Sequence, residues 1–137
     1  MPPPVRVSAR HLGIVCCLWI AGYEAAWRSA GTGRLAELFT DDVVYRQSPY
    51  EDPVIGLDAV RRMWDAERDG PAEGFTLATD ILAVDGDRAV VRAEVHYAQP
   101  EQEYRDLWII QLGDDGRCRD FEEWPYWPDR PYAPGGG

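Results

Sequence analysis

Two acidic residues near the C-terminus, Glu122 and Glu123, lie beside aromatic residues and are well placed for proton transfer. Side chains alternate between the two faces of a strand, so Glu123 would share a face with Phe121, and Glu122 with Trp124. A carboxylate inside an aromatic cavity has its charged form disfavoured by desolvation, which suits it to general acid–base catalysis. We therefore predict Glu123 as the acid–base residue, with Glu122 in that role if a bulge shifts the register. The alternative is a surface acid paired with an arginine.

Two tyrosines and a histidine are the next candidates. Tyr23 and Tyr45 could donate hydrogen bonds to an oxygen that gains negative charge during a reaction. Equally, both could be core tyrosines with their hydroxyls at the rim of the core. His96 is a candidate because histidine side chains suit proton transfer at neutral pH. Its strand neighbours Arg92 and Glu94 are polar, which favours a position facing solvent or a dimer partner; His96 is kept among the ligand-binding candidates.

Tryptophans are candidates for a ligand site because aromatic side chains commonly line hydrophobic pockets. The ligand-binding candidates of this kind are Trp19, Trp27, Trp64, Trp108 and Trp124. Aromatic stripes at helical spacing more often belong to the core, so we expect only some of the five to touch a ligand.

Helices are expected in the first half of the chain. They are predicted over residues 12–30, 34–39 and 57–68, with Asp41 and Asp42 in a turn before a short strand at 43–46. Gly31 and Gly33 end the first of these helices, and the Asp-Gly-Pro sequence after residue 68 ends the third.

Strands are expected in the second half. They are predicted over residues 75–84 and 88–98, followed by a hairpin built from 104–112 and 117–127. The apolar run at 107–112 fits a strand covered on both faces. In the 88–98 strand, Ala89, Val91, Ala93, Val95 and Tyr97 would face the core. In the last strand, one face would carry Cys118, Asp120, Glu122 and Trp124, and the other Arg119, Phe121 and Glu123. Helices followed by an antiparallel meander indicate an α+β fold.

Length and charge limit the possible functions. The 137 residues suffice for one domain with a proper core, expected at 12–127, between a disordered lead-in at 1–11 and a flexible tail at 128–137. The net charge of −10 argues against binding to nucleic acid or anionic membranes. No apolar run approaches the ~20 residues of a membrane span. All 14 basic residues are arginine, which indicates a GC-rich, bacterial genome.

The cysteines do not form a disulfide framework. There are three, of which Cys16 and Cys17 are adjacent, and this predicts a reducing, cytoplasmic location. The adjacent pair has no further ligands at metal spacing, so we expect no metal site and no cofactor. The segment 12–20 after Arg6 and Arg10 resembles a short signal-peptide core, but the aromatic stripe that continues to Trp27 favours a helix of the domain.

Several segments taken together resemble a known family. The stretches 23–31 and 35–45, the segment Pro53-Val-Ile-Gly56-Leu-Asp-Ala-Val60 and the closing Phe121-Glu-Glu-Trp124 are similar to NTF2-like (nuclear transport factor 2-like), SnoaL-type proteins. The resemblance covers about residues 17–127. It implies a cone-shaped α+β barrel of helices packed on a strongly curved, mostly antiparallel sheet, with a deep apolar cavity and frequent homodimers. It implies no single activity, because the fold carries isomerases, cyclases, dehydratases, epoxide hydrolases and binding proteins.

The resemblance also bears on the site residues. The closing-strand acid of polyketide cyclases corresponds best to Glu123. A site of the ketosteroid-isomerase kind would use Tyr23 with Asp41 or Asp42. An epoxide-hydrolase site would join Asp106 to Arg92 or Arg105, which strand parity does not support.

We therefore expect a small hydrophobic or aromatic molecule as the ligand of a homodimeric protein. One hypothesis is a cofactor-independent isomerase, cyclase or dehydratase that uses acid–base chemistry. The others are a non-catalytic binder of small molecules and a dimerisation module with a filled core.

Overall fold

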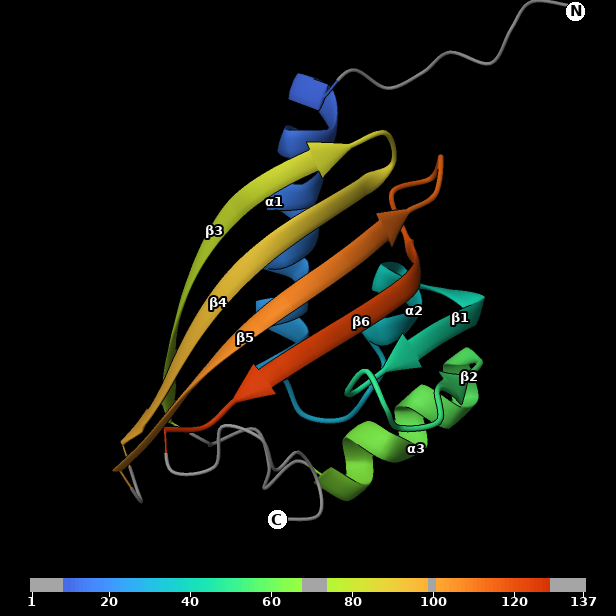
Figure 1. The fold of residues 1–137 in the computed structure, drawn as a ribbon. Coiled ribbons are helices and arrows are strands. Elements are labelled where there is room, and N and C mark those ends of the chain that lie inside the picture. The colour runs from blue at the N-terminus through green and yellow to red at the C-terminus, as the bar shows by residue number, and fades with distance from the viewer. Residues whose placement is uncertain (1–8, 68–73, 99–100, 129–137) are drawn as a thin grey trace, which may run out of the picture.

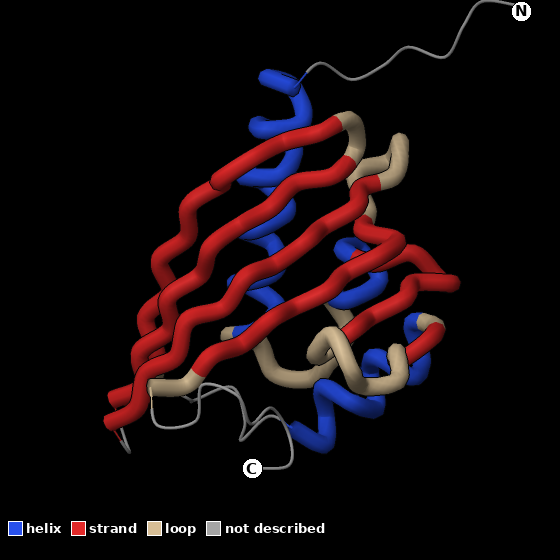
Figure 2. Tube along the Cα trace, in the orientation of Figure 1, coloured by secondary structure: helices blue, strands red, loops and turns tan. Residues whose placement is uncertain are grey.

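The computed structural model describes residues 9–67, 74–98 and 101–128 (Figure 1). Its elements, in chain order, are α1 (Ala9–Trp27), α2 (Leu35–Leu38), β1 (Phe39–Arg46), β2 (Val54–Ile55), α3 (Leu57–Glu67), β3 (Phe75–Asp85), β4 (Arg88–Ala98), β5 (Glu101–Leu112) and β6 (Cys118–Tyr126). The helices belong to the first half of the chain and the long strands to the second, and Figure 2 shows how these long strands lie side by side in one curved sheet. The predicted α+β class is confirmed.

One curved sheet of six strands, in the order β2-β1-β6-β5-β4-β3, forms the body of the domain. The four long strands are antiparallel neighbours, whereas β1 pairs in parallel with β6. In Figure 1, α1 runs behind this sheet along its inner face. The sheet does not close into a barrel, because β2 and β3 remain at its two edges.

The first helix begins and ends earlier than predicted. It starts at Ala9, so three residues of the expected lead-in belong to it, and it ends at Trp27 instead of residue 30. The hydroxyl of Ser29 donates a hydrogen bond to the carbonyl of Ala25 over 2.6 Å, and the chain then turns through Gly31, whose φ is 71°. Serine competes for backbone carbonyls in this way at helix ends. The rest of the lead-in and most of the tail lie outside the described residues.

The prediction of a turn at Asp41 and Asp42 is wrong. Both residues belong to β1, which begins directly after α2 at Phe39. Phe39 pairs with Cys118 and Val44 with Asp120, so β1 is irregular between these two pairs. The two acidic residues lie in this irregular part of the strand and are exposed. Exposed polar residues of this kind occur both in turns and in irregular strands, so their polarity alone did not identify the strand.

Strand β4 confirms the predicted alternation. The side chains of Ala89, Val91, Ala93 and Val95 are buried, while Arg92 and His96 are exposed on the other face. In β5 the prediction of a strand covered on both faces is not met equally on the two sides. Trp108, Ile110 and Leu112 are buried, but Leu107 and Ile109 are only half-buried on the outer face. No helix in the described part of the chain covers this outer face of the sheet (Figure 1).

A bulge in β6 changes the predicted faces of its first residues. Leu112 pairs with Cys118 and Gln111 with Asp120, so Arg119 has no partner in β5. A residue inserted in this way reverses the alternation before it. Cys118 is therefore buried with Phe121, and Arg119 is exposed, contrary to the simple count by twos. After the bulge the count holds, and Phe121 is buried in the core.

The core fills most of the space between α1 and the sheet. Trp19 of α1 contacts Phe39 and Phe121, with ring centroids 5.6 and 5.8 Å apart. Its indole N–H donates a hydrogen bond to the carbonyl of Leu38 over 2.9 Å, which ties α1 to α2. Among the described helices, none has the length and hydropathy that a membrane crossing requires.

Candidate active site

Two carboxyl groups meet on the inner face of the sheet. In the antiparallel pairing of β5 with β6, Trp108 lies opposite Glu123, and Asp106 lies opposite Pro125. Asp106 and Glu123 are thus diagonal neighbours on one face, close enough for long side chains to touch. Their side chains are hydrogen-bonded to each other. Because ionised carboxylates only accept hydrogen bonds, this contact requires a proton on one of the two groups.

Asp106 is the most deeply buried acid among the described residues, with only 4% of its surface exposed. Its Oδ2 accepts a hydrogen bond from the indole N–H of Trp108 over 2.9 Å. Burial raises the pKa of the Asp106 carboxyl, and the hydrogen bonds from Glu123 and Trp108 oppose this shift only in part. In such a pair, the carboxyl that holds the shared proton can act as a general acid and the ionised carboxyl as a general base.

Two tyrosines from different elements approach the same space. The hydroxyls of Tyr23 on α1 and Tyr45 on β1 are 3.3 Å apart and hydrogen-bonded. Burial, followed by the charge of Glu123 for Tyr23 and that of Tyr23 for Tyr45, raises the pKa of both phenols well above its usual value. Both hydroxyls therefore keep their protons. One of them donates to the other in this bond, and the second remains available as a hydrogen-bond donor.

These groups line one pocket with a volume of about 170 Å³. Its lining residues are Tyr23, Trp27, Tyr45, Met63, Trp64, Tyr97, Tyr104, Asp106, Trp108 and Glu123. α1, β1, α3 and three strands of the sheet each contribute at least one side chain. Seven of these ten side chains are aromatic, so the two carboxyls lie among the rings of tyrosine and tryptophan.

Most of the predicted site residues come together here. Glu123, Tyr23, Tyr45, Trp27, Trp64 and Trp108 all line the pocket. Glu122, the alternative to Glu123, lies on the outer face, where its carboxylate accepts a hydrogen bond from the indole of Trp124 over 2.5 Å. Glu123 is thus the inward acid of the pair, as strand alternation predicts.

Three predicted ligand-binding residues lie elsewhere. Trp124 is half-buried on the outer face of β6. His96 is exposed on the outer face of β4, with its Nε2 3.5 Å from the carboxylate of Glu103. Trp19 lines a second, larger hollow of about 410 Å³ between the N-terminal half of α1 and the β5–β6 turn, whose acids, Asp114 and Asp115, are exposed. The positions of these three do not support contact with a ligand beside the carboxyl pair.

The alternative constellations do not assemble. Asp41 and Asp42 are exposed on β1, away from the residues that line the pocket. Arg92 pairs with Asp80 and Arg105 with Glu94 on the outer face, so neither arginine joins Asp106 inside. This agrees with the parity argument against an epoxide-hydrolase arrangement.

Sequence reasoning missed Asp106 as a partner of Glu123, and it also missed Met63, Tyr97 and Tyr104 as pocket residues. Period two along β5 places Tyr104 and Asp106 on the same face as Trp108, so the strand pattern contained the signal. The continuous apolar run that follows Asp106 obscured it, because such a run favours a strand buried on both faces.

Other reactive groups contribute nothing to this site. Burial raises the pKa of the Cys16 thiol to about 11 and that of Cys118 to about 12, so neither is a thiolate near neutral pH. In the parts of the chain that the structure describes, no three His, Cys, Asp or Glu side chains are grouped so that they could hold a metal ion.

Comparison with known proteins identifies the family. The model of the SnoaL-like domain matches residues 20–121, which is most of the chain. The chain belongs to the SnoaL-like domain family. No curated protein sequence matches it significantly. The NTF2-like fold expected from the sequence is confirmed by structural neighbours of that fold.

Several solved structures resemble the domain. A SnoaL-like polyketide cyclase candidate from Jannaschia sp. CCS1 has a TM-score of 0.65 at 17% identity, and the match covers 91% of this chain and 90% of that one. A polyketide cyclase candidate from Sinorhizobium meliloti has a TM-score of 0.60 at 27% identity over 77% of this chain and 92% of the other. A steroid delta-isomerase from Pseudomonas aeruginosa has a TM-score of 0.59 at 21% identity over 84% and 82%.

Proposed function

We propose that this SnoaL-like domain is a cofactor-independent enzyme that moves a proton within a small, largely apolar molecule. The observation that carries the proposal is the hydrogen-bonded pair of Asp106 and Glu123 inside an aromatic pocket. Two carboxyls in one site whose protonation states differ form an acid–base pair. The described residues outside the pocket offer no comparable pair, because their carboxylates lie near the surface.

The reaction we propose is an isomerisation or ring closure. The ionised carboxyl of the pair accepts a proton from a C–H bond next to a carbonyl group, and the electron pair of that bond moves to the carbonyl oxygen. The hydroxyl of Tyr23 or Tyr45 donates a hydrogen bond to this oxygen and stabilises the charge. Return of the proton to another carbon completes an isomerisation with no other reactant. Attack of the enolate carbon on a second carbonyl, whose oxygen takes the proton, completes a ring closure.

Similar proteins support this class of reaction. Two of the structures compared above are named as polyketide cyclase candidates and one as a steroid delta-isomerase. Those names concern acid–base chemistry on largely apolar carbon skeletons. They come from proteins at 27% identity or less, so the proposal for this chain rests on its own carboxyl pair.

The test is a titration of tryptophan fluorescence with polycyclic and terpenoid ketones, in wild type beside Glu123→Gln. Trp27, Trp64 and Trp108 line the pocket, so a bound ligand should quench their emission. We expect saturable quenching in both proteins and conversion of a bound ketone only by wild type. Incorporation of solvent deuterium at the carbon next to the carbonyl measures the proton transfer. Binding without conversion or exchange in wild type would indicate the non-catalytic binder instead. The absence of any quenching would favour a domain whose aromatic residues serve only as core.

We also propose that the domain forms homodimers. The outer face of the sheet has half-buried apolar side chains at Leu107, Ile109 and Trp124, and no described helix covers it. Burial of this surface against a second copy would remove apolar area from water. Light scattering on wild type and Leu107→Glu tests the proposal: wild type should have twice the mass of the chain, and the variant the mass of one chain.

A further inference from the structure

Arg28, the first residue after α1, joins that helix to an edge of the sheet. β3 stands last in the strand order, so one of its two sides is a free edge of the described sheet. The carbonyl of Gly74 accepts a hydrogen bond from the amide of Ala98 and thus faces β4. Successive carbonyls of an antiparallel strand face opposite sides, so the carbonyl of Phe75 faces the free edge. There it accepts a hydrogen bond from the guanidinium of Arg28 over 2.9 Å.

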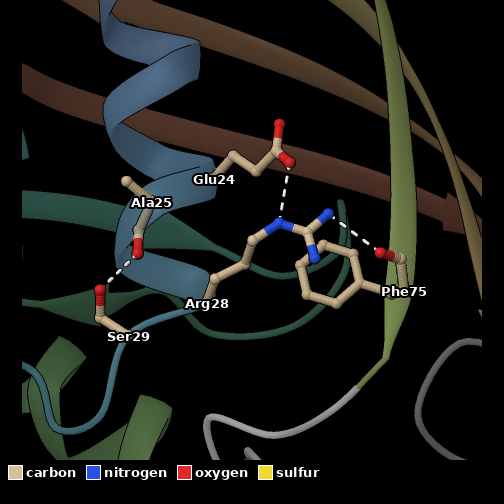
Figure 3. A network of polar contacts seen from close by, with 5 residues as sticks. All are labelled: Glu24, Ala25, Arg28, Ser29 and Phe75. Carbon is tan, nitrogen blue, oxygen red and sulfur yellow. Dashed lines mark hydrogen bonds and ion pairs between the residues drawn. The ribbon is translucent and has the colours of Figure 1, made fainter.

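The same guanidinium makes two further contacts. Its Nε donates a hydrogen bond over 2.9 Å to the carboxylate of Glu24, which lies one helical turn earlier. Its central carbon lies 3.9 Å from the centroid of the Phe75 ring, a distance at which the face of the ring attracts a cation. Figure 3 shows how the Glu24 carboxylate, the Phe75 carbonyl and the Phe75 ring surround the guanidinium. Arg28 therefore holds both the backbone and the side chain of Phe75.

Phe75 in turn supports two walls of the pocket. Its side chain is buried behind the described lining residues. Its ring stacks on that of Trp27, with centroids 4.3 Å apart, and lies 5.9 Å from the ring of Tyr97. Trp27 and Tyr97 both line the pocket, the first from the end of α1 and the second from β4. The position of Phe75 therefore influences how far the helix wall and the sheet wall stand apart at this end of the pocket.

The contacts of Arg28 are separate from those of the carboxyl pair. Arg28 donates hydrogen bonds to Glu24 and Phe75, whereas Asp106 is held by Trp108 and Glu123. Loss of the guanidinium should therefore change the shape of the pocket and leave the acid–base groups in place. The ion pair with Glu24 is partly exposed, and such pairs contribute little to stability. The fold should thus survive the loss.

We propose that Arg28 is a positioning residue that sets the affinity of the pocket for its ligand. It acts through Phe75, which holds the ring of Trp27 in the pocket wall. A wall that is already held in place binds a ligand more tightly than one that must be ordered during binding, because less conformational freedom is lost. This inference rests on the proposed function for the location of the ligand, and it adds a residue outside the pocket that determines binding.

The first test needs no ligand. Arg28→Met retains the apolar stem of the side chain and removes its charge and its N–H donors. In wild type, nuclear Overhauser contacts should join the ring protons of Trp27 and Phe75, whose rings are stacked. We expect these contacts to weaken in Arg28→Met, because the ring of Phe75 is no longer held. Contacts of wild-type strength in this variant would overturn the inference.

The second test measures affinity for a defined probe, 2-tetralone, a ketone of two fused rings. Fluorescence titration should give Arg28→Met a dissociation constant about fivefold higher than that of wild type. Arg92→Met, which removes an arginine paired with Asp80 on the outer face, is the matched control and should bind as wild type does. Equal dissociation constants in wild type and Arg28→Met would overturn the inference, and so would an equal loss in the control.

A conservative variant separates positioning from charge. Arg28→Lys retains the positive charge, but an ammonium group lacks the planar fork that reaches the Glu24 carboxylate and the Phe75 carbonyl together. Its dissociation constant for 2-tetralone should lie between those of wild type and Arg28→Met. A variant with lysine that binds no better than Arg28→Met would show that the fork is essential and would support the inference further. Urea unfolding of the three arginine variants checks that all remain folded.

The proposed function can fail independently of this inference. A wild type that binds the ketone and does not convert it would count against the proposed reaction, and the dissociation constants would still decide the role of Arg28. If wild type does not bind the ketone, the proposed function fails, and the ring contacts decide whether Arg28 positions Trp27. With a ketone that is converted, Arg28→Met should raise KM about fivefold and keep kcat within about twofold. A lower kcat at unchanged KM would overturn the inference.

Discussion

Asp106 and Arg105 are neighbours in β5, but they lie in opposite surroundings. On the outer face, Nε of Arg105 lies 3.7 Å from the carboxylate of Glu94, and its side chain is 71% exposed. On the inner face, Asp106 is buried between Trp108 and Glu123. The outer acids thus meet arginine and water, and the inner acids meet aromatic rings and each other.

The difference shows how one sheet supports two kinds of carboxylate. An exposed ion pair contributes only about 0–1 kcal/mol, because water already solvates both charges. In the pocket, water is largely replaced by aromatic side chains, so a charge on Asp106 is stabilised by the hydrogen bonds from Trp108 and from its carboxyl partner Glu123. Stability therefore depends little on any single outer pair, whereas the proposed acid–base chemistry depends on the inner one.

The largest contrast that we expect concerns stability. Trp108 is 1% exposed on the inner face, so Trp108→Ala should reduce the free energy of unfolding by about 3–5 kcal/mol. Trp124→Ala, at a half-buried position on the outer face of the adjacent strand, should reduce it by about 1 kcal/mol. Urea unfolding measures both. Equal losses would mean that a second layer covers the outer face as tightly as α1 covers the inner one.

The next contrast concerns catalysis and uses adjacent glutamates. With any ketone that the wild type converts, Glu123→Gln should lower kcat by about 100-fold or more, because one carboxyl of the acid–base pair is removed. Glu122→Gln, which alters only the outer carboxylate that accepts from Trp124, should retain wild-type kcat. Initial rates at saturating ketone measure kcat for the wild type and for both variants. Similar losses in both variants would contradict the assignment of the inner acid.

A third contrast concerns the pH dependence of stability. The pKa of Asp106 is raised by burial above its ordinary value of 3.8, so between these two values the folded state holds a proton that the unfolded state has released. Folding stability should therefore fall as pH rises through this window, by at most about 1.4 kcal/mol per pH unit, and no further above the raised pKa.

Asp106→Asn should remove this slope, and Asp80→Asn on the outer face should keep it. Urea unfolding of the three proteins at intervals from about pH 4 to about pH 8 measures the slope. A wild type whose stability is as flat as that of Asp106→Asn would show that Asp106 is ionised in the folded protein.

The smallest effect should come from His96. Its ring is 56% exposed and lies 3.5 Å from Glu103 at the surface, so His96→Ala should change the free energy of unfolding by no more than about 0.5 kcal/mol. Ligand affinity in the fluorescence titration should not change either. Weaker binding in this variant would place the ligand on the outer face and reverse the comparison.

The sequence alone determined the fold class and the direction of many side chains. Successive residues of a strand point to opposite faces, so the polar Arg92 and His96 identified the outer face of β4, and Phe121 identified Glu123 as inward. The order of helices and strands, with the resemblance at both ends of the chain, sufficed for the family. These features depend on local geometry and on hydrophobic pattern, which the sequence carries directly.

Only the tertiary structure decided which residues meet. The partnership of Asp106 with Glu123 depends on the register between β5 and β6, and one inserted residue, Arg119, changes that register within a single strand. The contact of Tyr23 with Tyr45 depends on how α1 crosses the inner face beside β1. Such distances arise from the packing of elements that are far apart in the chain, and no local pattern specifies them.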